Sequence, residues 1–176
     1  MQAVMDPIQP TQLAAGLTLS IEHLDVGGGV IARGPHVFDR SNAGLPVTAR
    51  LTTYALALHD EGDPALVIEV AMSGCTRVRG LRWGSTYQTE REFDPSDIVN
   101  SKEPLARGGW RPVANLNLPL PPMEVRSSEP LRAKVLSRDP KCAATITIPN
   151  EHLRALLSWR ERYLSESKAL QSRLDQ

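Results

Sequence analysis

Apolar residues alternate two by two along most of this chain, and near its end they recur every three or four positions instead. Up to about Ile148 the alternation predicts β-strands, whose successive side chains point to opposite faces of a sheet. From Asn150 onward the wider spacing predicts one amphipathic helix, because Asn150 is a suitable N-cap and no glycine or proline follows before Leu174. The pattern therefore predicts a β-rich body that ends in a single helix.

The predicted helix carries a broad apolar face that narrows toward its end. This face is formed by Leu153, Leu156, Leu157, Tyr163 and Leu164. A face of this width favours packing against a sheet, so we expect the first turns to lie on the body. Beyond them the apolar residues thin out, and the last two turns are predicted either to project or to pair with a partner helix. The candidates for a helix interface are Leu156, Tyr163, Leu170 and Leu174.

The body is predicted to hold about seven short strands joined by turns that are rich in glycine and proline. The longest strand signal covers residues 47–58, and the turn at 60–64 leads into an apolar strand over 65–72, which predicts an antiparallel hairpin. Within 47–58 the apolar positions change from odd to even, so we expect a bulge near Thr52 and Thr53 or burial on both faces. Further strands are predicted over 17–21, 30–31, 76–82, 113–118, 131–136 and 143–148.

The N-terminal segment is predicted to be an extended arm over residues 1–10, followed by one capped helical turn over 11–16 that ends in Gly16. The three glycines at 27–29 predict a turn or bulge, because they lack the lysine and serine of a phosphate-binding loop. These boundaries give an arm with a helical turn over 1–16, a β-rich body over 17–149 and a C-terminal helix over 150–176. The predicted class is α+β and mostly β, an antiparallel sandwich or partly closed barrel with one amphipathic helix.

Composition narrows the function classes. The 176 residues suit one domain, and 20 lysines and arginines balance 20 aspartates and glutamates, so no bulk field attracts nucleic acid or an anionic membrane. No apolar run would span a bilayer and no secretory signal is legible, so we expect a soluble protein of the cytoplasm or of an assembled particle. Cys75 and Cys142 lie far apart in no metal-ligand spacing, which predicts two buried thiols and supports neither a disulfide framework nor a zinc site.

Candidate catalytic chemistry is sparse. The four histidines share no spacing that would bind a metal, and no cofactor motif is present. His36 with Asp39, or His59 beside Asp60, could act as acid and base, but such pairs also occur near turns without function. Ser73 and Cys75 lack the motif of a nucleophile elbow. We therefore assign no catalytic residue and no cofactor.

One concentration of side-chain chemistry stands out between residues 77 and 111, where the strand period weakens after 83 and a functional loop is predicted. Its members are Arg77, Arg79, Arg82, Trp83, Trp110 and Arg111. Guanidinium groups beside indoles bind phosphates, stack on bases or anchor protein interfaces. The structural alternative is a solvated strand face with two core tryptophans. Among the functional readings a protein interface leads, because the net charge is zero, and nucleic acid comes second.

Three short pieces of the chain resemble SecB-type export chaperones, in the same order along the sequence. They are Pro35 to Phe38, the segment 65–81 with Glu69, Val70, Gly74 and Gly80, and Arg107 to Trp110 leading to Leu116, Asn117 and Leu118. The resemblance implies an antiparallel sheet that tetramerises and binds unfolded polypeptide in apolar grooves. Residues 127–176 have no counterpart in it.

These observations together predict a protein that works by binding. We expect a non-enzymatic protein-binding or assembly protein that forms homo-oligomers, such as a structural subunit of a phage virion or tail. The first alternative is a SecB-like chaperone for unfolded chains. The second is a nucleic-acid-binding module that uses the surface between Arg77 and Arg111, and no membrane partner is expected.

Overall fold

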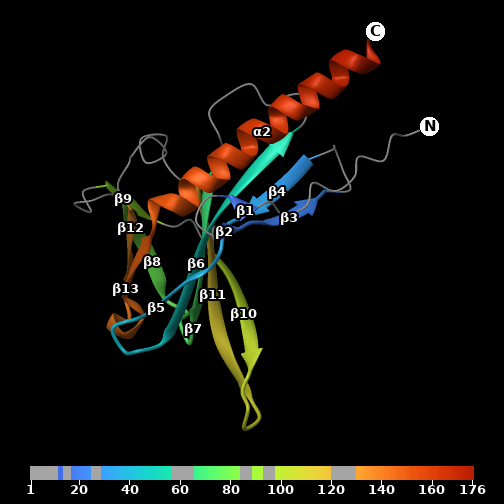
Figure 1. The fold of residues 1–176 in the computed structure, drawn as a ribbon. Coiled ribbons are helices and arrows are strands. Elements are labelled where there is room, and N and C mark those ends of the chain that lie inside the picture. Colours follow the sequence, from blue (N-terminus) through green and yellow to red (C-terminus); the bar gives the residue numbers. More distant parts are fainter. Residues whose placement is uncertain are drawn as a thin grey trace. The chain divides into compact units, whose positions relative to one another are not determined.

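The computed structural model describes residues 12–13, 17–24, 29–56, 66–83, 89–92, 98–119 and 130–176. Its strands are β1 (Gln12–Leu13), β2 (Leu17–Thr18), β3 (Ser20–His23), β4 (Gly29–Arg33), β5 (Val37–Arg40), β6 (Pro46–Leu56), β7 (Leu66–Ser73), β8 (Val78–Trp83), β9 (Thr89–Glu92), β10 (Ile98–Pro104), β11 (Trp110–Pro119), β12 (Leu131–Ser137) and β13 (Ala144–Ile148). A short 3-10 helix, η2 (Pro140–Cys142), precedes β13, and α2 (Asn150–Leu174) follows it (Figure 1).

The described strands form three antiparallel sheets. The largest has the order β10-β11-β7-β6-β4-β3, with β5 also paired to β6; the second has the order β13-β12-β8-β9; and β1 pairs with β2. The predicted fold class, mostly β and antiparallel with a C-terminal helix, is thereby confirmed. The chain divides into two compact units, one made of residues 1–35, 51–65 and 151–176 and the other of 36–50 and 66–150.

In the first unit α2 approaches the second half of β6 and Gly34, the residue that follows β4. Leu156 and Trp159 lie in the buried face of α2, and the Nε of Arg160 donates a hydrogen bond of 3.4 Å to the carbonyl oxygen of Tyr54 on β6. A Cβ added to Gly34 would lie 3.8 Å from Leu156, so strand and helix approach closely there. The prediction that the first turns of this helix pack on the body is consistent with these contacts.

The buried positions of β6 correct one detail of the expected pattern. Val47, Ala49, Leu51 and Ala55 are buried at odd positions, whereas Tyr54 is exposed, so the predicted change of phase toward Tyr54 is wrong. The register with β4 runs without a shift from Gly29 opposite Leu56 to Arg33 opposite Thr52, and no bulge interrupts it. Thr52 and Thr53 are both buried, so both faces of β6 are covered at this point, but the predicted burial of Tyr54 is not found.

The predicted helical turn over 11–16 is also wrong where the structure describes it. Gln12 and Leu13 form strand β1 and pair with Thr18 and Leu17 of β2. An isolated helical turn fixes three residues for one hydrogen bond, and a strand pair avoids that nucleation cost. The arm at 1–10, the glycines at 27–28 and the turn at 60–64 lie outside the described residues.

In the second unit, strands of the large sheet and of the sheet β13-β12-β8-β9 bury alternate side chains. Val70 and Met72 of β7 and Leu116 of β11 belong to the core, as do Val135 of β12 and Ile146 of β13. Buried and exposed residues alternate along the whole of β13 and along β12 from Leu131 to Val135, because each of these strands has one face on the core and one in solvent. The predicted strands over 131–136 and 143–148 are therefore present.

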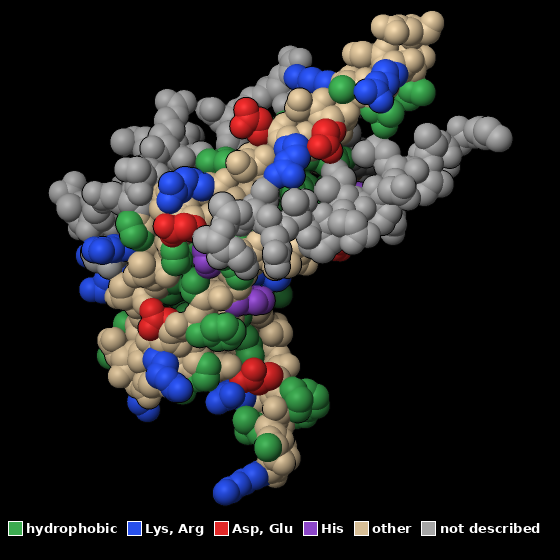
Figure 2. All heavy atoms as spheres, in the orientation of Figure 1, with side chains coloured by type: hydrophobic (Ala, Val, Ile, Leu, Met, Phe, Trp, Pro, Cys, Tyr) green, Lys and Arg blue, Asp and Glu red, His purple; other side chains and the backbone are tan. Residues whose placement is uncertain are grey.

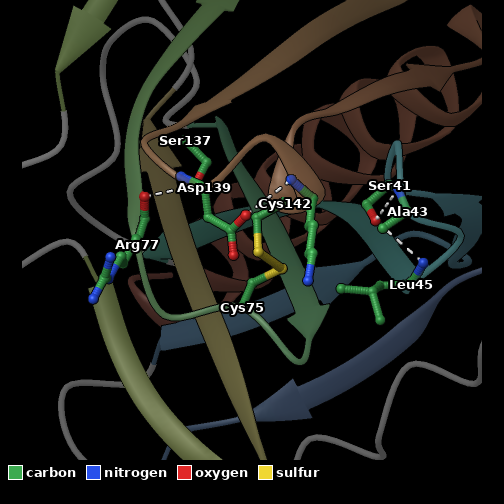
Figure 3. The surroundings of a disulfide bond; sticks show 9 residues. Ser41, Ala43, Leu45, Cys75, Arg77, Ser137, Asp139 and Cys142 are labelled. Atoms are coloured by element: carbon green, nitrogen blue, oxygen red, sulfur yellow. Dashed lines mark hydrogen bonds between the residues drawn. A yellow bond between two sulfur atoms is a disulfide. The ribbon is translucent and has the colours of Figure 1, made fainter.

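The two cysteines correct a second expectation. Cys75, which follows β7, and Cys142 in η2 form a buried disulfide with a Cα–Cα distance of 5.7 Å (Figure 3). Around it the Oγ of Ser137 donates a 2.6 Å hydrogen bond to the carbonyl oxygen of Arg77. The partners are 67 residues apart in sequence, so their spacing could not indicate that the β12–β13 connection folds back against the β7–β8 turn.

Candidate functional site

The hairpin of β10 and β11 carries several of the exposed large apolar side chains described in the second unit. These strands pair antiparallel from Ile98 opposite Leu116 to Pro104 opposite Trp110. The amide of Leu105 donates to the carbonyl oxygen of Gly109 at 3.1 Å and closes the turn. Gly108 and Gly109 have φ values of 84° and 89°, a left-handed conformation that strains other residues, so the two glycines shape the tip.

Three large apolar side chains of this hairpin face solvent. Trp110 is 66% exposed, Val99 56% and Leu105 41%. Trp110 and Leu105 lie at the tip, next to the exposed Pro104. Apolar side chains are visible on the surface of the hairpin in the space-filling view (Figure 2). Single exposed apolar residues are normal, but a group of them on one projecting element is typical of an interaction site.

A cluster of polar side chains fixes the hairpin where it extends past the end of β7, one register pair from Pro104 and Trp110, and this point is here called its root. The Oγ of Ser73 donates a hydrogen bond of 2.5 Å to Glu103, and the Nε of Arg111 donates one of 2.6 Å to the same carboxylate oxygen. These two bonds, Ser73 first, hold the pKa of Glu103 below its usual value, while desolvation opposes them. The amide of Gly74 also donates to the carbonyl oxygen of Pro112 at 2.6 Å. The exposed tip therefore extends from an anchored base.

Strand β10 lies at one edge of the described part of the large sheet. Its residues from Val99 to Lys102 are all exposed. An edge strand has backbone amides and carbonyls without a neighbouring strand, and it can pair with a strand of another chain. Lys102 and Pro104 on this edge are residue types that limit such pairing, so the edge is partly protected.

The predicted arginines lie elsewhere in the second unit. Arg77 and Arg79 are exposed, and Arg82 of β8 is half-buried opposite Lys134 of β12. The register between these strands shifts between Leu136 and Ser137. Trp83 pairs through its backbone with Ala133, and its side chain lies outside the described set.

The structure separates the predicted residues into different places. Arg79 and Arg82 lie on β8 and Arg77 directly precedes this strand, whereas Trp110 and Arg111 belong to the hairpin, and Arg111 is paired with Glu103. On α2, two of the four interface candidates are buried in their own unit and two lie toward the exposed tip. The buried ones are Leu156 and Tyr163; Leu170 is half-buried and Leu174 is 66% exposed.

The histidines are dispersed. His36 is exposed, His59 lies outside the described residues, and burial lowers the pKa of His152, with the nearby Glu151 opposing that shift. Within the described residues no three side chains among His, Cys, Asp and Glu form a group that could bind a metal ion. None of the helices described here is long and apolar enough to cross a bilayer.

No protein-family model, curated protein or solved structure matches this chain.

Sequence reasoning missed the apolar tip and the tryptophan of the helix. Leu105 and Val99 gave no signal, because the apolar residues around them follow neither a strand nor a helix period. Trp159 did give one, since it lies three residues after Leu156 and four before Tyr163 on the same helix face. The sequence indicates Trp110 as a candidate contact residue, but its exposure follows only from the hairpin geometry.

Proposed function

We propose that the protein is a self-associating assembly protein whose β10–β11 hairpin contacts a second copy of the chain. The observation that carries this proposal is Trp110, 66% exposed beside Leu105 on an anchored hairpin. Exposed tryptophans with apolar neighbours are the residues that most often dominate binding energy when a partner covers them. A structural subunit of a larger particle, such as a phage virion or tail, would use a projecting hairpin in this way.

Two features support a second copy as the partner. The chain has equal numbers of acidic and basic residues, so like charges do not oppose association of two copies. In addition, β10 is an edge strand of the described sheet, and its residues before Lys102 can pair antiparallel with those of a second copy about a two-fold axis, so that each copy presents the same surface. The exposed apolar tip would then be buried against the partner's hairpin.

Light scattering after size exclusion tests this proposal. We expect the oxidised full chain to have a mass above 19.3 kDa and the Leu105→Ser/Trp110→Ser variant to return to that mass. Leu174→Ser is a matched control, because Leu174 has the same exposed fraction as Trp110 but lies at the tip of α2. A monomeric wild type, or assembly lost only in the Leu174 variant, would overturn the proposal.

A second candidate function is binding of a polyanion by the outer face of the four-stranded sheet. Arg82 and Lys134 face each other across β8 and β12, Arg132 is exposed on β12, and Arg79 is exposed nearby in the sequence. Glu90 of β9 lies opposite Arg82 in register and offsets part of this charge. Binding of duplex DNA that weakens as salt rises and is lost in Arg79→Glu/Lys134→Glu would favour this candidate.

We further propose that the chain matures where disulfides persist, in place of the predicted cytoplasm. Buried disulfides such as Cys75–Cys142 are typical of extracellular, periplasmic and particle-associated proteins and are rare in reducing compartments. Thiol alkylation of the protein as isolated, followed by mass measurement, should label neither cysteine. Labelling of both cysteines would show that the disulfide is absent and would favour the predicted cytoplasmic location.

A further inference from the structure

A second surface of the 36–50 and 66–150 unit is the solvent-facing side of its large sheet. A shallow depression of about 410 Å³ lies there, within the roughly 300–1,000 Å³ range of small-molecule sites. Its polar lining consists of His36, Thr48, Arg50, Glu69, Asn115 and Asn117. None of these residues belongs to the apolar tip of the β10–β11 hairpin.

The strand register explains why these side chains meet. Asn117 of β11 lies opposite Glu69 of β7, and Asn115 lies opposite Ala71. Arg50 of β6 reaches Glu69 from the other side. Neighbouring strands are about 4.8 Å apart, so the side chains form a continuous polar surface, and Ala71, which also lines the depression, leaves room above its centre.

The charges in this depression neutralise one another. The Nε of Arg50 donates a 2.6 Å hydrogen bond to Glu69, and both side chains are about three-quarters buried, with relative exposures of 27% and 24%. Apart from the exposed His36, the remaining polar lining is neutral. A phosphate or carboxylate ligand would therefore find no net positive charge, whereas a ligand with neutral hydrogen-bonding groups would find donors and acceptors.

The amides are suited to hydroxyl groups. Asn115 uses its Nδ2 to donate to the carbonyl oxygen of Val99 at 3.1 Å and to the Oγ of Ser101 at 2.8 Å, which fixes the orientation of the side chain. Asn117 is exposed and its amide can both donate and accept. A fixed amide beside an exposed one can bind neighbouring hydroxyls of one ligand.

Exposed apolar groups flank this polar surface. Phe38 is 80% exposed, its ring centroid lies 6.3 Å from that of His36, and it pairs in register with Thr48. On the far side, Val99 lines the depression and is also exposed. An apolar ring at the border of a neutral polar surface complements a ligand whose ring faces carry C–H groups and whose edges carry hydroxyls.

We propose that this depression binds a neutral oligosaccharide. The hydroxyls bind to Asn115, Asn117 and the Arg50–Glu69 pair, and one sugar ring packs on Phe38. The proposal does not depend on self-association through the hairpin, because it uses a different surface of the same unit.

Amide chemical shifts of the full oxidised chain test the proposal, with cellohexaose, maltohexaose, chitohexaose and a heparin hexasaccharide as the added probes. We expect at least one neutral hexasaccharide to shift amides of β6, β7 and β11. Asn117→Ala should weaken that binding by about tenfold, the effect of roughly one lost hydrogen bond with its desolvated partner. Phe38→Ala should weaken it as well, and Lys168→Ala, at an exposed position of α2, should leave it unchanged.

Three results would overturn the proposal. These are no shifts with any neutral hexasaccharide, shifts with heparin alone, and equal affinity of the wild type and the Asn117→Ala variant. Asn117 is exposed, so its substitution is expected to leave stability within about 0.5 kcal/mol, and a thermal unfolding curve verifies that each variant is folded.

Discussion

Helix α2 contains a buried tryptophan, whereas the β10–β11 hairpin contains an exposed one. Trp159 of α2 is 3% exposed and its ring stacks on that of Tyr163, with centroids 5.4 Å apart. Trp110 of the hairpin is 66% exposed and anchored only through its strand. One tryptophan therefore contributes to folding, whereas the other contributes little to the isolated chain and is available for binding.

This difference arises from what each element packs against. The face of α2 continues without a gap from Leu153 through Leu156 and Tyr163 to the buried Ser167, because one side of the helix meets a sheet along most of its length. The tip of the hairpin extends past its anchored root at Glu103, where no described strand covers it. The comparison can be tested by removing side chains from the helix and from the hairpin.

The largest effect is expected for Trp159→Ala. Removal of a buried aromatic side chain leaves a cavity and lowers the free energy of unfolding by about 3–5 kcal/mol. Urea unfolding of the variant and of Trp110→Ala, as the matched control, provides the measurement. If both variants lose the same free energy of unfolding, Trp159 and Trp110 do not differ in their contribution to folding.

The disulfide is expected to contribute nearly as much. Cys75 and Cys142 close a loop with a sequence separation of 67, and a bond of this kind typically stabilises a protein by about 2–4 kcal/mol. Unfolding of Cys75→Ala/Cys142→Ala, compared with the oxidised wild type, should show that loss. A variant as stable as the wild type would mean that the two segments are held together without the bond.

A smaller, pH-dependent effect is expected at the root of the hairpin. The hydrogen bonds from Ser73 and Arg111 lower the pKa of Glu103 in the folded state, so the carboxylate stabilises the fold at pH values above its ordinary pKa of 4.5. This contribution is lost as the pH falls through the lowered pKa. The stability difference between the wild type and Glu103→Gln should therefore be present at neutral pH and shrink below about pH 4.5. A difference that stays constant with pH would contradict the assigned bonds.

The smallest effect on stability is expected for Trp110→Phe, within about 0.5 kcal/mol, because the side chain is exposed. Its fluorescence gives a sharper test. At a protein concentration low enough for the monomer, acrylamide should quench a component of the emission in the wild type that is missing in Trp110→Phe and retained in Trp159→Phe. If the two variants lose the same component, Trp110 is not more accessible than Trp159.

Much of the fold follows from period alone. The change of spacing at Asn150 predicted α2, and alternation predicted β6, β7, β12 and β13, because burial of one face requires these repeats. The pattern around Tyr54 was misleading, since an apolar residue at an even position need not be buried when its partner strand changes. β6 pairs with β5 over its first residues and with β4 over its last.

The candidate sites were less accessible to sequence reasoning. Trp110 and the arginines at 77, 79 and 82 were selected as one group, but contacts between separate sheets depend on long-range topology that local patterns do not contain. The disulfide and the polar depression share this property, because Cys75 with Cys142, and Arg50 with Glu69, meet only after distant strands have paired.

Hydrogen exchange at low and high protein concentration is the most direct test that the hairpin, and not the helix, is the association surface. We expect peptides covering residues 98–110 to exchange more slowly at high concentration, because β10 and the tip around Trp110 become covered by a second copy. Peptides of α2 over 150–174 should exchange at the same rate at both concentrations. Protection confined to the end of α2, or no change in either region, would contradict this account.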